Sequence, residues 1–157
     1  MDDTQKLGGA IVHEGELVSG NLKLVDTVRA KVDSIRRDAI RLNHTATHLV
    51  HAVLKQHLGD KVQQKGSLVD AARARFDFSY DKAVSPEVLV AIESDVNAAI
   101  RANTAVETEV MPMDDAVKAG AVALFGEKYS HDVRVLTMGE LSKELCGGTH
   151  AKRTGDI

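Results

Sequence analysis

Two short motifs that lie far apart in the chain constrain it most, because each carries metal-ligand side chains at a fixed spacing. The segment NHTATH contains His44 and His48, and the segment CGGTH contains Cys146 and His150. An HxxxH pair on a helix places both imidazoles on one face, one turn apart, where a single ion can bind both. Three imidazoles and one thiol form a Cys/His₃ set, which is typical of zinc. The sequence therefore predicts a metal site at these four residues.

The combination of the two motifs is more specific than either motif alone. The chain has seven histidines, so an HxxxH pair arises readily by chance. The only cysteine, however, lies shortly before a histidine, with Gly147 and Gly148 between them. Adjacent glycines favour a tight loop because they remove side-chain clashes. The alternative is a helix with solvent-exposed histidines and a buried structural cysteine.

The length and composition indicate one globular domain with an aliphatic core and a small appendage. Apolar residues make up 43% of the 157 residues, but aromatic residues make up only 3%. No apolar run approaches the ~20 residues that span a bilayer, and the polar N-terminus does not resemble a signal peptide. A single cysteine suits a reducing compartment. We therefore expect a cytoplasmic protein with no membrane partner.

The charge does not indicate a general nucleic-acid binder, since the formal net charge is −3 and the pI is about 6.1. Local basic clusters can still bind phosphate on a protein that is acidic overall. These clusters are Arg36, Arg37 and Arg41; Arg73 and Arg75; and Lys152 and Arg153. For any one of these residues, an ordinary solvent-exposed charge is the simpler interpretation.

Hydrophobic periodicity predicts a mixed α+β fold with a mainly antiparallel sheet packed with helices, because strands and helices do not alternate regularly. We expect strands within residues 1–33, including 24–33, and over 66–80, 106–112 and 133–138. We expect helices over 34–58, from Pro86 with Ser85 as its N-cap, and from Asp114 to Gly120. The buried stripe of the second helix is predicted to be Leu89, Ile92, Val96, Ala99 and Ile100.

The helix predicted over residues 34–58 carries an aliphatic arc on one side and a histidine stripe on the other. The arc consists of Ile40, Ala46, Leu49, Val50, Val53, Leu54 and Leu58. We expect the arc to be buried, and His44, His48 and His51 to line a cleft. His51 is either a further ligand or a polar neighbour of the site, and we favour the second interpretation.

The reaction class stays open at this point. Structural zinc sites usually have four protein ligands, whereas catalytic sites usually have three and an open position. HTATH lacks the glutamate of HExxH metalloproteases, and the zinc-deaminase pattern is absent. CGGTH matches no protease signature, so Cys146 is a weak candidate for a nucleophile.

Four longer segments resemble the editing domain of bacterial alanyl-tRNA synthetase. They are NHTATHLVHAVL, QQKGSLVDAARARFDFSYDKA, ALFGEKY and VRVLTMGELSKELCGGTHAKRTGDI. They occur in order, and the resemblance extends over nearly the whole chain. The same domain type occurs in stand-alone alanyl-tRNA trans-editing proteins. The metal-free editing domain of threonyl-tRNA synthetase is more distantly similar.

The resemblance implies hydrolysis of tRNA(Ala) that is mischarged with serine or glycine, at a Zn²⁺ site formed by His44, His48, Cys146 and His150. It also implies pocket roles for Thr47 and Gln64, to which Asn43 and Ser67 are added as weaker candidates. We expect the basic residues to contact the tRNA end: Lys65, Arg73, Arg75, Lys152 and Arg153. If the chain is a fragment, the remaining synthetase domains are further partners.

The resemblance also suggests a division into a partial β-barrel-like segment, residues 1–36, and a zinc-binding editing domain, residues 37–157. Two alternatives share the same ligands. One is a non-catalytic zinc- or tRNA-binding fragment of a larger synthetase, and the other is a general metallohydrolase that acts on small esters.

Overall fold

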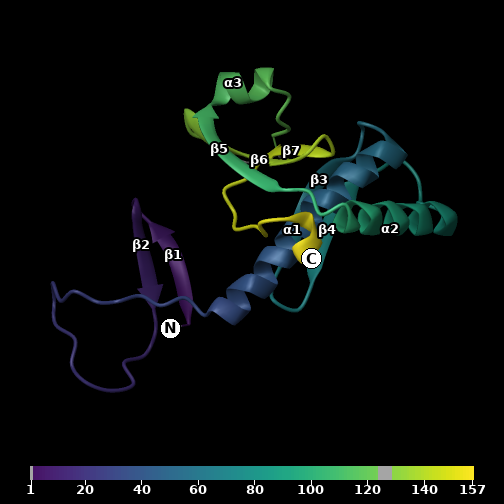
Figure 1. Ribbon diagram of the computed structural model, residues 1–157. Helices are drawn as coiled ribbons and strands as arrows, with labels where there is room; N and C mark the ends of the chain where they lie inside the picture. The colour runs from purple at the N-terminus through teal and green to yellow at the C-terminus, as the bar shows by residue number, and fades with distance from the viewer. Residues whose placement is uncertain (1, 124–128) are drawn as a thin grey trace. The chain divides into compact units, whose positions relative to one another are not determined.

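A computed structural model describes residues 2–123 and 129–157 of the chain (Figure 1). The internal contacts divide the chain into two units, Met1–Val32 and Asp33–Ile157. In the part of the chain that the structure describes, no helix is both long enough and apolar enough to cross a membrane.

The first unit contains one antiparallel hairpin, formed by β1 (Asp3–Leu7) and β2 (Ala10–Glu14). Gly8 and Gly9 connect the strands with φ values of +53° and +86°, a backbone conformation that favours glycine in a two-residue turn. The strand predicted over residues 24–33 is wrong, since these residues form no strand. Alternating side chains do not make a strand unless another strand supplies backbone hydrogen bonds. No closed barrel occurs among the described residues.

The long helix of the second unit, α1 (Ser34–Leu58), has the predicted bounds because both ends carry local signals. At its N-terminus the Asp33 carboxylate accepts a hydrogen bond from the backbone N–H of Arg36 at 3.0 Å. At its C-terminus Gly59 adopts φ +88°, which is unfavourable for other residues, and its N–H donates to the Lys55 carbonyl.

The helix α1 is buried on more than one side, and its histidines line pockets, as the prediction of a cleft-lining histidine stripe expects. The aliphatic residues Leu49, Val53 and Leu54 are buried as expected. His48 and His51 are also buried, each only 4% exposed. His48 and His51 are therefore covered by other elements that pack over the helix, whereas His44 stays partly exposed.

The second helix, α2 (Pro86–Arg101), begins as predicted, with the Ser85 hydroxyl accepting a hydrogen bond from the Val88 N–H. Ile92 is buried and Val96 is partly buried in the adjoining core. Leu89 is 51% exposed, so its place in the predicted buried stripe is wrong. Val88 packs against the core instead.

The segment predicted as one strand over residues 66–80 is an antiparallel hairpin, formed by β3 (Gln63–Val69) and β4 (Ala74–Ser79). The single-strand prediction is wrong because Asp70 makes a turn. Its Oδ1 accepts hydrogen bonds from the N–H groups of Ala72 and Arg73, at 2.7 and 2.9 Å. The register shifts between Gln64 and Gly66, which is typical of a β-bulge.

A three-stranded antiparallel sheet completes the fold in the order β5-β6-β7. Its strands are β5 (Val106–Pro112), β6 (Asp132–Met138) and β7 (Ser142–Leu145), with α3 (Met113–Lys118) after β5 and a short 3₁₀ helix at Thr154–Asp156. Asp114 lies in the first turn of α3 and does not cap it, since Pro112 is the N-cap residue. The predicted α+β class with antiparallel pairing is confirmed.

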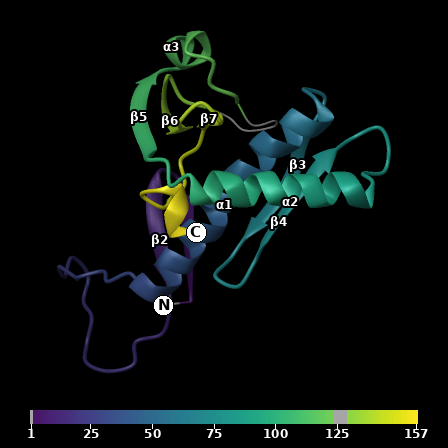
Figure 2. The ribbon, with the colours of Figure 1, turned by 45° about the vertical axis from the view of Figure 1, so that its right-hand side comes forward.

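The core of this unit places the end of the sheet beside the middle of α1. Leu49 of α1 packs with Leu136 and Met138 of β6, and Cys146 adjoins this cluster. On another side, Val53 and Leu54 pack with Ile92 of α2 and with the β3–β4 hairpin. Both views show the C-terminal segment returning to α1 (Figures 1 and 2). The two predicted metal-ligand motifs are thereby brought together.

Candidate metal centre

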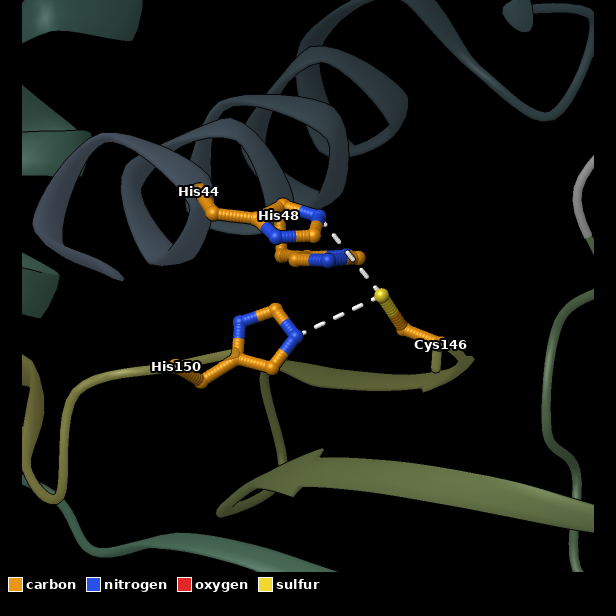
Figure 3. Close-up of side chains that lie close together, drawn as sticks. All are labelled: His44, His48, Cys146 and His150. Carbon is orange, nitrogen blue, oxygen red and sulfur yellow. Dashed lines mark hydrogen bonds between the residues drawn. The ribbon is translucent and has the colours of Figure 1, made fainter. Parts of the chain in front are cut away.

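The four predicted metal ligands form one cluster. His44 and His48 lie one turn apart on α1, and Cys146 and His150 lie in the loop that follows β7 (Figure 3). Each residue offers one ligand atom, and the four atoms lie within 4.8 Å of one another. A single metal ion can therefore reach all four after small side-chain adjustments.

Cys146 makes most of the contacts within the cluster. Its Sγ lies 3.3 Å from His150 Nε2 and 3.6 Å from His44 Nε2, and it accepts a hydrogen bond from the Gly148 N–H. Burial raises the pKa of the thiol, but the contacts with His150, His44 and His48 outweigh burial and lower this pKa to about 3. Cys146 is consequently a thiolate at neutral pH, which is the form that binds metals.

The two glycines of CGGTH differ in how much space the structure leaves around them. A Cβ atom on Gly148 would lie 2.1 Å from Cε1 of His44, so a side chain there would displace a ligand. A Cβ atom on Gly147 would meet nothing within 4 Å. Only Gly148 is required by a close approach of the loop to α1.

His48 has one ring nitrogen in a strong hydrogen bond and the other without a partner. Its Nδ1 lies 2.6 Å from Oε2 of Glu144. Its Nε2 is buried and has no hydrogen-bond partner, although the ring belongs to the four-residue cluster. A buried nitrogen without a partner is costly, and a bound metal ion removes that cost. The cluster thus fits a metal such as Zn²⁺ in its donor types and in this free lone pair.

Glu144 is a functional residue that the sequence analysis missed. It lies on β7, is 3% exposed, and contacts both His48 and His51. Burial raises the pKa of this carboxyl, but the hydrogen bonds from the two histidines outweigh burial and lower the pKa to about 2. The only sequence signal is its position two residues before Cys146 in a short strand, where Ser142 and Glu144 share the inward face.

His51 lies next to the cluster but does not belong to it, as favoured by the sequence analysis. Its Nδ1 lies 2.9 Å from Oε1 of Glu144, and its ring lies 5.2 Å from the ring of Phe76, measured between centroids. It is therefore a polar neighbour that holds the carboxylate, and the cluster that could hold an ion consists of the four predicted residues.

Thr45 is the second residue that the sequence analysis missed. It is fully buried, its hydroxyl donates to the Arg41 carbonyl, and its oxygen accepts a hydrogen bond from the Ala151 N–H at 3.0 Å. The same oxygen lies 3.5 Å from Nδ1 of His150. Thr45 therefore joins α1 to the loop of residues 146–150, which carries Cys146 and His150 and is called the ligand loop below.

A pocket of about 290 Å³ opens beside the cluster. Thr47, Gln64 and Ser67, which the resemblance implied as pocket residues, all line it. The remaining lining residues are His44, His48, Val69, Phe76, Glu144, Leu145, Cys146, Gly147 and Gly148. The pocket thus joins the histidine face of α1, the β3–β4 hairpin and the loop after β7.

Asn43, the other pocket candidate, has a different environment. Its Nδ2 donates a hydrogen bond to the Asp70 carbonyl at 2.8 Å, and it is not a lining residue. Asn43 therefore attaches the turn of the β3–β4 hairpin to α1, which helps to fix the hairpin beside the pocket.

The Thr47 hydroxyl is available only as an acceptor. It lies 2.8 Å from the His44 carbonyl and 3.0 Å from the Asn43 carbonyl, so its hydrogen is used within the helix. The oxygen keeps a lone pair that can accept a hydrogen bond from a bound hydroxyl group.

The five basic residues expected to contact tRNA lie outside the pocket lining. Lys65, Arg73 and Arg75 belong to the β3–β4 hairpin, and Lys152 and Arg153 follow the ligand loop. All five are exposed. Arg153 donates hydrogen bonds to the side chain and the backbone carbonyl of Asn103, so it also joins the C-terminal segment to the end of α2.

Of the segments that carry the resemblance, ALFGEKY is described only at Ala123 and Tyr129, and residues 124–128 lie outside the described residues.

Comparison with known proteins identifies the same group that the motifs indicated. Residues 133–157, which include Cys146 and His150, match the family described as the threonyl and alanyl tRNA synthetase second additional domain. The chain is 64% identical over 157 residues to alanine–tRNA ligases of Legionella pneumophila strains Paris, Lens and Corby. The predicted resemblance to alanyl-tRNA synthetases is confirmed. The alignment covers the whole chain but only 18% of each ligase.

Proposed function

We propose that this chain carries a metal-dependent hydrolytic site that edits tRNA(Ala) mischarged with serine or glycine. One observation carries the proposal. Thr47 and Gln64 line the same pocket of about 290 Å³ as His44, His48 and Cys146. Pockets near this size hold small groups such as an aminoacyl moiety. The similarity to alanine–tRNA ligases supports tRNA(Ala) as the substrate carrier.

The physical need for such a site follows from the size of the amino acids. A synthetic pocket that fits alanine cannot strongly reject serine, and it cannot sterically exclude glycine, so a second, hydrolytic site is required. Here the Thr47 oxygen accepts a hydrogen bond from the serine hydroxyl. This contact distinguishes serine from alanine, but it does not explain the hydrolysis of glycine, which lacks the hydroxyl.

The residues that hold the metal are His44, His48, Cys146 and His150, and the thiolate with imidazoles favours Zn²⁺. When bound, the ion supplies Lewis-acid polarisation or orientation at the aminoacyl ester. The side-chain amide of Gln64, which both donates and accepts, positions the substrate or the attacking water at the mouth of the pocket.

The partners in this proposal are the acceptor end of tRNA(Ala) and the remaining domains of a synthetase. Lys65, Arg73, Arg75, Lys152 and Arg153 supply positive charge toward the tRNA phosphates, although each of them has an ordinary role as an exposed charge. In this proposal the chain acts in the cytoplasm.

A second candidate function is a non-catalytic zinc- and tRNA-binding module. The observation that favours it is the set of four protein ligands, since closed four-ligand sites are typically structural. This candidate predicts metal and tRNA binding without turnover.

Deacylation assays separate the two candidates. Zinc-loaded protein is mixed with Ser-tRNA(Ala), Gly-tRNA(Ala) or Ala-tRNA(Ala), and the release of each amino acid is measured. We expect rapid loss of serine and glycine while Ala-tRNA(Ala) persists. The Thr47→Val variant, which keeps the side-chain shape but removes the hydroxyl, should lose the preference for serine over alanine while glycine release is unchanged. Decay of all three at the rate without enzyme would refute editing by this chain and favour the binding module.

A further inference from the structure

The Glu144 carboxylate connects two histidines of α1, of which only one belongs to the metal-ligand cluster. Oε2 lies 2.6 Å from Nδ1 of His48, and Oε1 lies 2.9 Å from Nδ1 of His51. The Ser142 hydroxyl donates a further bond to Oε1 at 3.4 Å. All three residues around the carboxylate are less than a tenth exposed, so the arrangement is built into the interior.

This geometry determines where the histidines carry their protons. An ionised carboxylate only accepts hydrogen bonds, so both histidines must donate to it through Nδ1–H. In the neutral form of His48, which is the form that binds a metal, this leaves the lone pair on Nε2, the buried atom without a hydrogen-bond partner. The carboxylate thereby keeps His48 in the tautomer and ring orientation that a metal ligand needs.

The carboxylate also balances charge. A divalent ion bound by three neutral imidazoles and one thiolate retains one positive charge. Glu144 supplies one negative charge next to this site and is only 3% exposed, so water screens the carboxylate weakly. Without the carboxylate the loaded site would keep an uncompensated positive charge next to the buried His48 ring, which is costly.

We propose that Glu144 is a positioning residue that sets the metal affinity of the site by fixing His48 and balancing the charge of the ion, while His51 holds the second carboxylate oxygen. The role of Glu144 rests on the metal binding proposed above. It extends the site by two residues, Glu144 and His51, that the ligand motifs do not contain.

A merely structural role for Glu144 makes a different prediction. If the carboxylate only joined β7 to α1, its loss would lower the stability of the apo protein and leave the intrinsic metal affinity of the folded protein unchanged. If it positions His48, its loss weakens metal binding even where the protein remains folded. Metal affinity is therefore the quantity to measure.

The test uses Co²⁺ as the probe, because its absorption bands report thiolate ligation and tetrahedral geometry. Co²⁺ is titrated against a chelator of known affinity into the wild-type protein, Glu144→Gln and the control Glu140→Gln. Glutamine keeps the shape but loses the charge, and its NH₂ group cannot accept a bond from the second histidine. Glu140 lies exposed in the turn between β6 and β7, so its variant makes the same charge change away from the site.

We expect Glu144→Gln to bind Co²⁺ about 10- to 100-fold more weakly than the wild type, which is typical for outer partners of a ligand histidine. The thiolate-to-cobalt band should persist at saturation, and Glu140→Gln should match the wild type. A Glu144→Gln protein with native circular dichroism and wild-type affinity would overturn the proposal. A wild-type protein that binds no Co²⁺ or Zn²⁺ would overturn the metal site itself, and the role of Glu144 with it.

A second measurement does not require a variant to fold. Long-range ¹⁵N–¹H correlation spectra of the zinc-loaded wild-type protein identify the protonated nitrogen of each imidazole. The expected result is Nδ1–H on both His48 and His51, with Nε2 of His48 shifted by metal ligation. A proton on Nε2 of His48 would contradict the proposed role of Glu144.

Discussion

At the scale of single residues, the geometry of the site depends on how closely Gly148 approaches the ring of His44. Gly148 approaches the His44 ring so closely that a Cβ atom would lie 2.1 Å from Cε1. Its N–H also donates to the Cys146 sulfur. Gly148 therefore determines both how near the loop comes to α1 and how the thiolate is held, whereas Gly147 has open space around it.

These two glycines provide a matched pair of variants. In Gly148→Ala the new methyl group must push His44 or the loop aside, so we expect metal affinity to fall about 10- to 100-fold, as for other losses of ligand positioning. Gly147→Ala should retain wild-type affinity. Competition with a chromogenic zinc chelator measures both. Equal affinities for the two variants would show that the close approach does not control the site.

At the scale of elements, the ligand loop is held to α1 by side-chain to backbone contacts. Thr45 is the main connection, since its oxygen accepts a hydrogen bond from the Ala151 N–H and its hydroxyl donates to the Arg41 carbonyl. Asn43 makes the corresponding contact to the β3–β4 hairpin. Neighbouring polar residues on one helix thus position two separate elements around the pocket.

Replacing Thr45 by valine tests this connection, because valine has nearly the same shape but no hydrogen-bonding group. The buried Ala151 N–H would lose its acceptor, so we expect the free energy of unfolding to fall by about 1–3 kcal/mol. Thr108→Val on β5, where the side chain is exposed, should change stability by less than about 0.5 kcal/mol. Urea denaturation followed by circular dichroism compares the two, and a smaller loss for Thr45→Val than for Thr108→Val would contradict this role.

At the scale of the whole molecule, the proposed metal joins segments that are distant in sequence. His44 and Cys146 are separated by 102 positions, so a bound ion cross-links α1 to the loop after β7. A ligand that binds only the folded protein stabilises it by mass action, by about 2.7 kcal/mol at 100 times its Kd. Metal removal should therefore weaken the fold as well as the site.

Thermal unfolding with and without zinc measures this effect. The Tm of the wild-type protein should rise when zinc is added and fall again with a chelator. Cys146→Ser, which removes the thiolate ligand, should show little response to zinc. A zinc-dependent rise of equal size in Cys146→Ser would mean that the stabilising ion binds elsewhere.

The four residues of the cluster, the α+β class and the bounds of α1 could be predicted from the sequence because their signals are local. HxxxH and CxxxH are short spacings, and the capping residues lie next to the helix they end. The hairpin at residues 63–79 was missed because alternation continued through its turn, where Asp70 bonds to Ala72 and Arg73.

The roles of Glu144 and Thr45 could not be predicted from the sequence, because each residue makes its hydrogen bond to a residue about a hundred positions away. The prediction of a strand over residues 24–33 was wrong for a related reason. Its alternating pattern is local, but a strand also needs a neighbouring strand, which the pattern cannot reveal.

The distance in sequence between the two halves of the cluster also sets an order of events during synthesis. A ribosome that adds about 5–20 residues per second needs roughly 5–20 s to travel from His44 to Cys146. During that interval the helix histidines exist without the thiolate, and the complete four-ligand set does not yet exist. Binding of the proposed metal by all four residues would therefore follow translation of nearly all of this segment, and it would occur only in chains in which the loop after β7 has packed against α1.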